Sequence, residues 1–492
     1  MKLNIKKKEN IYLAPYTPTA TLFAEYLQKT QGLTIKGYID ESKIGKDIYT
    51  LDTIKDLDIE KVFIISPNWG RNIYDNLSKI IRKKKLIIIT KNDNNHYKTS
   101  LLNSTLVQCF DKILIKTINI TFKYFNIQIT KLWTNRIGEL CLESEAFLYK
   151  LNNNTEYKKK NFIILSYMNE REISNNTLYN LYKASYKKCK NILLLEENIL
   201  NKYLLYILKN KLIEDKYYCN IEQKSNAYNL FIHKKPMIQF QEYDVRKGKR
   251  GLEKLKIKKP FVCIFARDSQ YLNTTFKYDK WVQNDCRDSD IDTNDLAIQY
   301  LIDKGYNVVR VGSLVSKELR FKHPKCIDYP YSGLRSDFMD IFLLSECAFA
   351  IGGHSGIMDI CNAFAKVRLG VNIIPIDGPT YATKDDIYIP KKLKLNGEYL
   401  GLRKYLEIMN YSELNHFKSQ TYEKLDIEIE NNSSKEILMI VKEYLGDITH
   451  NDTDAKLLKK YYEIHENSKQ FSEVKTKIGI QFLRDNLWYL AD

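Results

Sequence analysis

The feature that most constrains this fold is the stretch 260–376, in which strand, loop and helix signals alternate three times along the chain. Short apolar runs that predict buried strands occupy residues 261–266, 306–311 and 349–351. Between the first two, apolar residues at helical spacing predict a helix that Asp292 or Thr293 caps and Gly305 ends. Ser336 is placed to cap a second helix before the third strand. Because parallel neighbours need a crossover, and these crossovers read as helical, the stretch predicts a parallel α/β sheet.

Polar and glycine residues follow each predicted strand. In chain order they are Arg267 and Asp268, then Arg310 and Gly312, then the turn of Gly353, His354, Ser355 and Gly356. Because ligands of such sheets bind at the carboxyl ends of the strands, we expect these residues to line one site. A glycine-rich turn that enters a helix points amides and the positive end of the helix dipole at an anion, usually phosphate. The pattern predicts a nucleotide diphosphate site, although glycines also occur at such turns for steric reasons alone.

The same motifs, taken in order, resemble a known family. RDSDIDTNDLAIQYLIDKGYNVVRVG, RSDFMDIFLLSECAFAIGGHSG and DDIYIPKK are similar to motifs of bacterial glycosyltransferases found with surface-polysaccharide synthesis. NRIGEL at residues 135–140 and the closing IGIQFLRDNLWYL extend the resemblance from about residue 125 to the C-terminus. It implies a metal-independent GT-B architecture of two α/β halves, and transfer of a sugar from a nucleotide-sugar to a glycan, lipid-linked or protein acceptor.

We therefore expect an α/β fold of three Rossmann-like units, the last two forming the GT-B pair. The expected ranges are 1–100 for an accessory domain, 101–255 for the acceptor half, 256–447 for the nucleotide-sugar half and 448–492 for C-terminal helices. The resemblance implies that those last helices pack back on the N-terminal half. The basic segment 242–259 reads as a hinge between the halves, either a flexible solvated linker or a stretch that touches a phospholipid surface.

The first hundred residues predict a separate Rossmann-like unit, which resembles the small domain that precedes bacterial sugar acyltransferases. Its first turn, Pro15-Tyr16-Thr17-Pro18, has none of the glycines that a dinucleotide pyrophosphate requires. The unit is therefore expected to keep the fold without binding NAD, and to have a recruiting or structural role. Asp40, at the position that usually contacts ribose, is the residue that tests this expectation.

The acceptor half supplies catalytic candidates. In a GT-B fold the first strand-to-helix loop faces the cleft, and here that loop carries Arg136 and Glu139. A carboxylate in a closed cleft could take the proton of the acceptor hydroxyl as a general base. The family often has histidine at this position, and Glu139 also fits a helix-capping glutamate, so both roles stay open. Together with His354, these two residues are the predicted catalytic set.

The predicted donor-binding residues are Arg267, Asp268, Arg287, Asp290, Arg310, Gly312, Gly353, His354, Ser355 and Gly356. Asp288-Ser289-Asp290 resembles the DxD metal signature of the other major glycosyltransferase architecture, but acids before a helix also stabilise its dipole. GT-B enzymes usually neutralise the leaving diphosphate with amides and basic side chains. We therefore expect no essential metal and no cofactor beyond the nucleotide-sugar substrate, with Arg287 and Asp290 holding sugar or ribose hydroxyls.

The charge balance favours anionic partners. Lys and Arg number 77 against 60 acidic residues, a net charge of +17, which suits nucleotides, phosphorylated lipids or an anionic inner-membrane surface. The lysines are spread along the whole chain, as on a solvated surface, and the expected partners include other glycan-assembly enzymes but no nucleic acid. Nine cysteines without a CxxC pair or zinc spacing favour a reducing cytoplasm.

Two other functions remain open. A nucleotide-sugar epimerase or oxidoreductase would use the N-terminal unit, although that unit lacks the GxGxxG fingerprint. A non-catalytic scaffold would bind a nucleotide-sugar and hold a glycan-assembly complex together without transferring the sugar.

Overall fold

The computed structural model describes residues 10–14, 18–31, 33–40, 47–50, 52–65, 77–78, 80–81, 86–91, 97–99, 105–166, 173–196, 199–209, 212–219, 235–268, 270, 285–376, 383–411, 418–466 and 477–491. The chain divides into two compact units, Met1–Thr121 and Phe122–Asp492. Both are built on parallel β-sheet with helices between the strands, so the predicted α/β class is confirmed. Among the described residues, no helix combines the length and the apolar character that a bilayer crossing requires.

The first unit contains a six-stranded sheet in the order β3-β2-β1-β4-β5-β6. Its elements include β1 (Ile11–Ala14), α1 (Pro18–Gln31), β2 (Gly37–Ile39), β3 (Ile48–Tyr49), β4 (Lys61–Ile64), β5 (Leu86–Lys91) and β6 (Tyr97–Thr99). The neighbouring strands are parallel except for β5 and β6. Phe23 of α1 lies edge-on to Phe63 of β4, with ring centres 6.0 Å apart, so this helix covers one face of the sheet.

The prediction that the first unit does not bind NAD depends on Asp40 and on the turn after β1, and the structure describes only some of these residues. Asp40 directly follows β2 and is 8% exposed, and its backbone N–H donates to the carbonyl of Tyr49 at 3.0 Å. Residues 15–17 of the turn without glycines lie outside the described residues. The role of this unit therefore stays a prediction.

The second unit begins with a three-stranded parallel sheet, β7-β8-β9, which follows the long helix α3 (Thr105–Tyr124). The elements are β7 (Ile127–Leu132), α4 (Ile137–Asn153), α5 (Thr155–Lys158), β8 (Asn161–Ser166), α6 (Asn176–Lys187), β9 (Ile192–Leu195) and α7 (Ile199–Lys209). Phe147 of α4 lies edge-on to Phe162 of β8, with ring centres 5.0 Å apart, and Tyr182 of α6 is fully buried. This aromatic core fixes α4, whose first turn carries Glu139.

A seven-stranded parallel sheet forms the rest of the unit, in the order β12-β11-β10-β13-β14-β15-β19. The strands are β10 (Phe261–Ile264), β11 (Asn307–Arg310), β12 (Cys326–Asp328), β13 (Phe349–Gly352), β14 (Val367–Ile373), β15 (Ile387–Pro390) and β19 (Lys477–Ile478). Every residue of β10, β11 and β13 is buried, as expected for strands covered on both faces. The order runs outward in both directions from β10 and β13, so these neighbours form the switch point beside which such sheets bind ligands.

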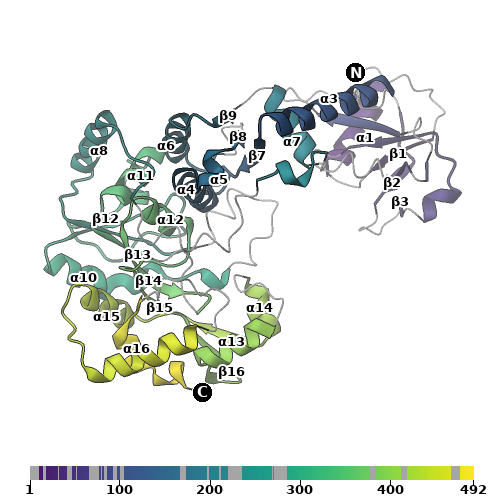
Figure 1. The fold of residues 1–492 in the computed structure, drawn as a ribbon. Helices are drawn as coiled ribbons and strands as arrows, with labels where there is room; N and C mark the ends of the chain where they lie inside the picture. The colour runs from purple at the N-terminus through teal and green to yellow at the C-terminus, as the bar shows by residue number, and fades with distance from the viewer. Residues whose placement is uncertain are drawn as a thin grey trace. The chain divides into compact units, whose positions relative to one another are not determined.

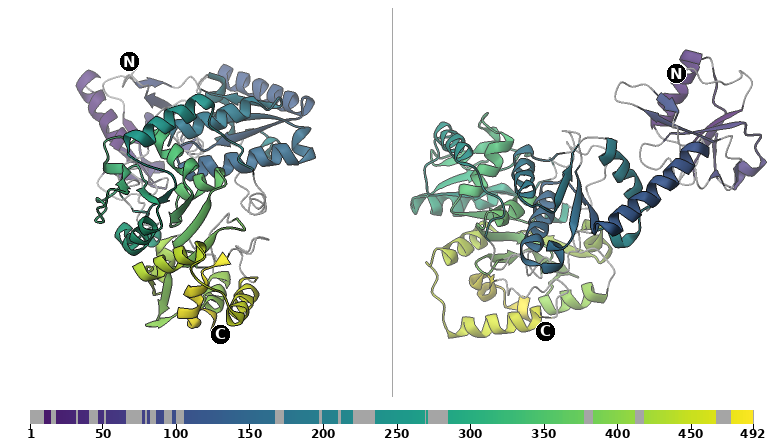
Figure 2. Two further views of the ribbon diagram at one scale, coloured as in Figure 1. Left: turned by 90° about the vertical axis from the view of Figure 1, so that its left-hand side faces the viewer. Right: turned by 45° about the horizontal axis from the view of Figure 1, so that its top comes forward.

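Helices cover both faces of this sheet (Figure 1, Figure 2). On one face, α11 (Asp337–Glu346) contacts α6 and α12 (Gly356–Ala363) contacts α4, so the two sheets of the unit are joined through these helices. On the other face, α10 (Asp295–Asp303) packs against α15 (Ser434–Tyr444). The junction between the two halves therefore lies on the α11 and α12 side of the large sheet.

The helix signals of the sequence are largely confirmed. Ser336 caps α11, its Oγ accepting from the N–H of Met339 at 3.2 Å, and Gly305 follows α10 with a φ of +93°. α10 begins at Asp295, later than predicted, because a 3₁₀ turn capped by Asp290 occupies the preceding residues. The prediction of a helix between the first two strands is thus right in kind, and its predicted start is one or two residues too early, since the N-cap is Asn294.

The basic segment between the two sheets is a helix, so the prediction of a flexible linker is wrong. α8 (Glu242–Lys254) begins with a capping box of Gln241 and Asp244 and buries Gly248 and Leu252. A Cβ on Gly248 would meet the ring of Phe342, which belongs to α11. Glycine at this position lets α8 pack closely on α11, which explains why a chain so rich in Lys and Arg is ordered here.

The remaining elements complete the second half. They are β16 (Lys392–Leu395), β17 (Glu398–Tyr399), α13 (Leu402–Tyr411), α14 (Ser419–Lys424), β18 (Ile427–Glu430), α16 (Asp452–His465) and α17 (Ile480–Asp485). The hydroxyls of Tyr388 in β15 and Tyr461 in α16 are 2.8 Å apart, and α16 also contacts α13. Packing of the C-terminal helices onto the N-terminal half stays a prediction, as do the finer domain boundaries.

Candidate functional site

The switch point brings the glycine-rich turn beside the end of β10. The two strands pair in parallel with Ile264 opposite Ile351, so the residues that follow β10 and the turn that follows β13 leave the same edge of the sheet. Ser355 is the N-cap of α12, which begins at Gly356. The first N–H groups of a helix have no partner within it and favour an anion, so this edge is electrostatically suited to phosphate.

The two halves cross at a pair of glycines. A Cβ on Gly356 would lie 2.7 Å from the backbone nitrogen of Gly138. A Cβ on Gly138 would lie 3.0 Å from the Cα of Gly356 and 2.8 Å from a carboxylate oxygen of Asp359. Because neither position has room for a side chain, the first turns of α4 and α12 approach through their backbones. Predicted site residues of both halves, Arg136 and Ser355, are thereby brought to one junction.

Four cationic side chains gather at this junction: Arg136, Arg267, Arg287 and Lys391. Burial, followed by the charges of Arg267 and Arg136, lowers the pKa of Arg287 to about 10. Burial and, to a smaller degree, the charge of Arg267 lower the pKa of Lys391 to about 8. Arg136 pairs with Glu139 and Arg267 pairs with Asp288, whereas Arg287 and Lys391 form no ion pair with an acid among the described residues. An anion bound beside Arg287 and Lys391 would offset the cost of burying their charge. Lys391 was not among the predicted residues.

Asp288 organises part of this cluster. Its carboxylate forms an ion pair with Arg267, whose side chain is only 9% exposed. Its backbone carbonyl accepts a hydrogen bond from Nζ of Lys391 at 2.7 Å. One residue thus holds two of the four cations, one through its side chain and one through its backbone.

Several polar atoms at the junction are buried without a hydrogen-bond partner among the described residues. They are Nε of Arg287, Oγ of Ser355 and Oδ1 of Asn135. Buried polar atoms usually have partners, and each exception requires an explanation. Two of these atoms come from the large-sheet half and one comes from the loop before α4. A polar ligand bound where the halves meet would account for all three.

His354 is a neutral imidazole in this setting. Its Nδ1 lies 2.8 Å from the carbonyl oxygen of Ile374, and since a carbonyl can only accept, Nδ1 carries the proton. Burial, followed by the charges of Arg287 and Arg368, lowers the pKa of His354 to about 4. The ring therefore offers Nε2 as an acceptor at neutral pH and supplies no positive charge.

A cavity of about 370 Å³ opens at the carboxyl ends of β10 and β11. Its lining includes Ala266, Asp268, Asp288, Ser289, Asp290, Arg310, Ser316 and Lys317. Asp268 accepts from the backbone N–H and the hydroxyl of Ser316 at 3.0 and 3.2 Å. A cavity rich in carboxylates suits the hydroxyls of a ribose or a sugar, and Asp288 connects it to the cation cluster.

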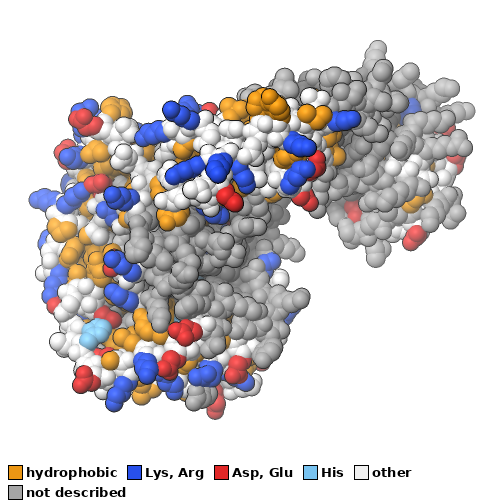
Figure 3. Space-filling view, in the orientation of Figure 1, with side chains coloured by type: hydrophobic (Ala, Val, Ile, Leu, Met, Phe, Trp, Pro, Cys, Tyr) orange, Lys and Arg blue, Asp and Glu red, His pale blue; other side chains and the backbone are white. Residues whose placement is uncertain are grey.

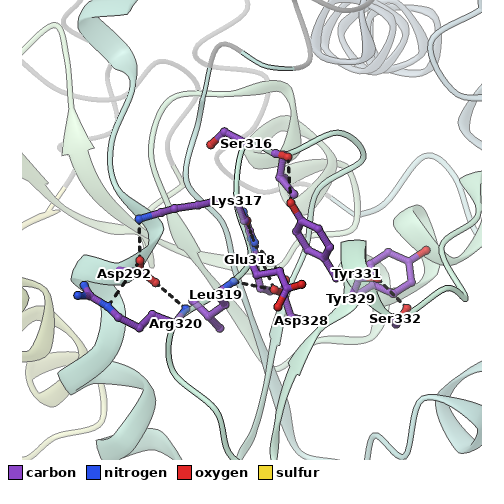
Figure 4. Close-up of polar contacts among 12 residues, drawn as sticks. Asp292, Ser316, Lys317, Glu318, Leu319, Arg320, Asp328, Tyr329, Tyr331 and Ser332 are labelled. Carbon is purple, nitrogen blue, oxygen red and sulfur yellow. Dashed lines mark hydrogen bonds and ion pairs between the residues drawn. The ribbon is translucent and has the colours of Figure 1, made fainter.

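The loop that borders this cavity is held by two acids, Asp292, which is buried, and Asp328, whose side chain is 13% exposed (Figure 4). Nζ of Lys317 lies 2.6 Å from Asp292, and the carboxylate of Asp328 accepts from the N–H of Leu319 at 2.7 Å. Arg310 is 3% exposed and forms an ion pair with Asp328 at 3.1 Å, and it also donates to the carbonyl of Lys317 at 2.7 Å. These contacts engage Arg310 with the protein itself, and its predicted contact with the donor stays a prediction.

Gly312 and Gly353 both lie in crowded surroundings. Gly312 has a φ of +155°, and a Cβ there would lie 2.9 Å from Cγ1 of Val315. A Cβ on Gly353 would lie 3.3 Å from the carbonyl oxygen of Val371. The structure thus gives both glycines a steric reason, and their part in donor binding stays a prediction.

Two carboxylates lie near the crossing of α4 and α12. Glu139 accepts from Nη1 of Arg136 at 2.6 Å, with the two side chains 36% and 39% exposed. Asp359, in the first turn of α12, faces the start of α4. Burial raises the pKa of Asp359 to about 7, although the charges of Arg368 and Arg287 act in the opposite direction. The sequence analysis missed Asp359 because an acid in a first helical turn reads as a partner of the helix dipole.

The raised pKa of Asp359 predicts a pH-dependent stability. A carboxyl whose pKa is higher in the folded than in the unfolded state stabilises the fold below pH 4, and this contribution is lost as the pH rises through about 7. We expect Asp359→Asn to melt at a higher temperature than the wild type at pH 8, and the difference to shrink towards pH 4. Melting curves across this pH range measure it, and a difference that is constant with pH would contradict the assignment.

Comparison with known proteins gives a likeness of structure alone. No protein-family model and no curated protein matches the chain. E. coli ADP-heptose lps heptosyltransferase II is 12% identical over 65% of this chain and 98% of its own, with a TM-score of 0.34. A glycosyl transferase family 9 structure from Veillonella parvula DSM 2008 is 10% identical over 65% of this chain and 97% of its own, with a TM-score of 0.36. S. aureus MnaA with UDP is 11% identical over 98% and 96%, with a TM-score of 0.21. Scores this low carry no argument, so the functional inference rests on the site itself.

Proposed function

We propose that this protein is a glycosyltransferase that moves a sugar from a nucleotide-sugar donor to a glycan, lipid-linked or protein acceptor. The observation that supports this most is the junction of the two halves, where Arg136, Arg267, Arg287 and Lys391 gather beside the N-terminus of α12. The lowered pKa values of Arg267, Arg287 and Lys391 and the unpartnered buried atoms of Arg287, Ser355 and Asn135 fit a site built for an anion with several oxygens. The adjoining cavity of about 370 Å³ has room for the rest of the donor.

In the proposed reaction the bond between the anomeric carbon and the diphosphate oxygen breaks, while the acceptor oxygen bonds to that carbon. Negative charge then grows on the leaving diphosphate. Cations and helix amides fixed in place before the reaction stabilise this charge more than the ground state, which is how such groups accelerate a reaction. Because His354 is neutral, we assign it a hydrogen bond from a donor hydroxyl through Nε2, and we leave charge compensation to the arginines and Lys391.

The acceptor proton needs a base near the crossing of α4 and α12. Glu139 is held by Arg136 and is partly exposed, whereas Asp359 has a pKa of about 7 and faces the same loop. A base whose pKa lies near the working pH is the more effective proton acceptor. We therefore propose Asp359 beside Glu139 as a candidate base, and a bell-shaped pH profile whose acidic limb disappears in Asp359→Asn would support it.

We further propose that the reaction needs no bound metal ion, because the four protein cations supply the positive charge that a metal would bring to the diphosphate. In the same proposal the protein acts in the cytoplasm, peripheral to the inner membrane, in bacterial surface-polysaccharide or glycoconjugate synthesis. Donor, acceptor and other assembly enzymes are its partners.

The test is a thermal-shift panel on the full chain with ADP, UDP, GDP, CMP and inorganic pyrophosphate. A ligand that binds only the folded state stabilises it by RT ln(1 + [L]/Kd), about 2.7 kcal/mol at 100 times Kd. We expect at least one nucleoside diphosphate to raise the melting temperature by several degrees. This increase should be larger than the increase that pyrophosphate produces. No shift with any member of the panel would contradict the proposal.

Turnover separates the transferase from its two rivals. A transferase hydrolyses the matching nucleotide-sugar slowly in water and, when an acceptor is present, consumes the donor faster by transferring the sugar to the acceptor hydroxyl. A scaffold binds the nucleotide-sugar and leaves it unchanged. An epimerase or oxidoreductase would convert the sugar while it is still attached to the nucleotide, and mass spectrometry of the donor after incubation distinguishes these products.

A further inference from the structure

α8 and the residues directly after it carry exposed basic side chains that have no acidic partner among the described residues. Glu242 pairs with Arg246 at 2.6 Å at the start of the helix, and Lys259 pairs with Glu346 just after its end. Between these pairs the exposed cations are Lys247, Lys249, Arg250, Lys254, Lys256 and Lys258. None of these six forms an ion pair with an acid among the described residues. Their charges are therefore available to an anionic partner.

Three of these cations border a groove of about 390 Å³ between α8 and the start of α11. Lys247, Arg250 and Lys254 are spaced three and four residues apart, which places them on one side of the helix. The other lining residues are Gly251, Leu255, Leu334, Ser336, Phe338 and Met339. Nζ of Lys247 lies 4.2 Å from the centre of the Phe338 ring. The groove thus has a cationic rim over a largely apolar floor.

One exposed apolar side chain, Leu334, lines the groove, and others occur on α8 and on the turn that precedes α11. Leu334 is 44% exposed and Tyr331 is 48% exposed, while Tyr243, one turn before Lys247 on α8, is 63% exposed. Figure 3 shows Lys and Arg side chains interspersed with apolar ones on the α8 side of the second unit. Cations next to exposed aromatic and aliphatic groups match the two layers of a bilayer interface, its anionic headgroups and the start of its hydrocarbon.

We propose that this surface, the α8 groove, docks on an anionic phospholipid bilayer. The lysines and arginines contact lipid phosphates, and the apolar floor takes the glycerol region of one headgroup. A nucleic acid would satisfy the cations but would leave the floor of Leu255, Leu334 and Met339 unused, so the lipid surface is the better match. The inference does not depend on the proposed transferase activity, because it concerns a surface apart from the cation cluster.

The position of the groove fits such a contact. α11 begins at the carboxyl edge of the large sheet, because helices that follow parallel strands start there. Nδ2 of Asn175 donates to the carbonyl of Asp337 at 3.0 Å, and the N–H of Asn176 lies 3.3 Å from its carboxylate. These bonds join the start of α6 to the start of α11 beside the groove. Docking through the groove would therefore bring the junction of the halves towards the membrane.

The test is co-sedimentation of the full chain with vesicles of phosphatidylcholine alone and of phosphatidylcholine with 30% phosphatidylglycerol, at 0.1 M salt. Each basic residue near an anionic bilayer contributes about 1 kcal/mol, so changing three of them is expected to weaken binding by roughly 100-fold. The variant is Lys247→Glu, Arg250→Glu and Lys254→Glu together. The matched control is Lys456→Glu, Lys459→Glu and Lys460→Glu on α16, which makes the same change in net charge at exposed lysines.

We expect the wild type and the α16 control to bind the anionic vesicles alike, and the α8 variant to lose binding while keeping the wild-type melting temperature. Equal loss in both triple variants would overturn the proposal, because it would indicate a general charge effect. Tight binding to duplex DNA that depends on α8, without vesicle binding, would assign the surface to nucleic acid instead. Arg287→Met should bind vesicles like the wild type, which separates this test from a failure of the proposed function.

Discussion

Arg287→Met is expected to weaken binding of the preferred nucleoside diphosphate by about 10- to 150-fold, since a hydrogen bond to a charged group contributes about 1.5–3 kcal/mol. Turnover should fall further, by about 10²- to 10³-fold, as for the loss of one preorganised donor to a developing anion. Without ligand, the variant should melt at the wild-type temperature or above it. The reason is that Arg287 is buried next to Arg267 and Arg136, which lower its pKa to about 10.

Arg310→Met is the matched comparison, because it removes a second buried arginine from the same sheet edge. Arg310 is paired with Asp328 and bonded to the carbonyl of Lys317. Its loss leaves the carboxylate of Asp328, whose side chain is 13% exposed, without its ion pair but with the hydrogen bond from the N–H of Leu319. Such a loss costs roughly 1–3 kcal/mol. Urea unfolding and ligand titration of both variants give opposite signatures: Arg287→Met loses binding and keeps stability, whereas Arg310→Met loses stability. If Arg287→Met unfolded as easily as Arg310→Met, the arginine would be part of the framework and the proposed anion site would be wrong.

This contrast also marks what the sequence predicts about the site. Arg267 and Arg310 look equivalent in the sequence, since each lies at the end of a predicted strand, and Arg287 lies in the loop between these strand ends. Their environments differ because Asp328, which comes eighteen residues after Arg310, pairs back with it along neighbouring strands. Whether an arginine meets an acid of the protein or a ligand is decided by tertiary pairing, which local patterns do not contain.

Residues far from the motifs are missed for the same reason. Lys391 lies after β15 and reaches the backbone of Asp288, which is 103 residues earlier. The signal that could have found it is the charged pair Lys391-Lys392 directly after a buried strand, the same rule that selected Arg267. Asp359 is missed because its role depends on α4, a helix of the other half, crossing at Gly138.

The fold is predicted better where local and global preferences agree. β10, β11 and β13 are short apolar runs between turn signals, and Ser336 and Gly305 mark helix ends by their own chemistry. α8 is the failure: its Lys and Arg suggest a solvated linker, and its buried side is partly glycine, which no hydrophobic pattern reveals. The buried side of α8 is identified only by its contact with α11, where Gly248 packs on Phe342.

Asp386→Ala is expected to have the largest effect on stability of any single change considered, a loss of about 3–5 kcal/mol in the free energy of unfolding of the second unit. Asp386 and Arg368 are 2% exposed each. The carboxylate lies 2.6 Å from Nη2 of Arg368 and accepts from the N–H groups of Arg368 and Thr383 at 2.8 and 2.7 Å. Removing it strands a buried guanidinium and two backbone donors at once.

Asp386→Ala should also affect the candidate site, because Nη1 of Arg368 lies 3.5 Å from the carbonyl oxygen of Met358 in α12. The charge of Arg368 lowers the pKa of His354 and opposes the rise in the pKa of Asp359, so an unpaired Arg368 would disturb both. Asp385→Ala, at the exposed neighbouring position, is the control. It should change the free energy of unfolding, measured by urea unfolding, by less than about 0.5 kcal/mol. Because the two variants remove the same carboxylate one residue apart, a similar midpoint in both would mean that the buried pair with Arg368 does not hold the start of β14 to the start of β15.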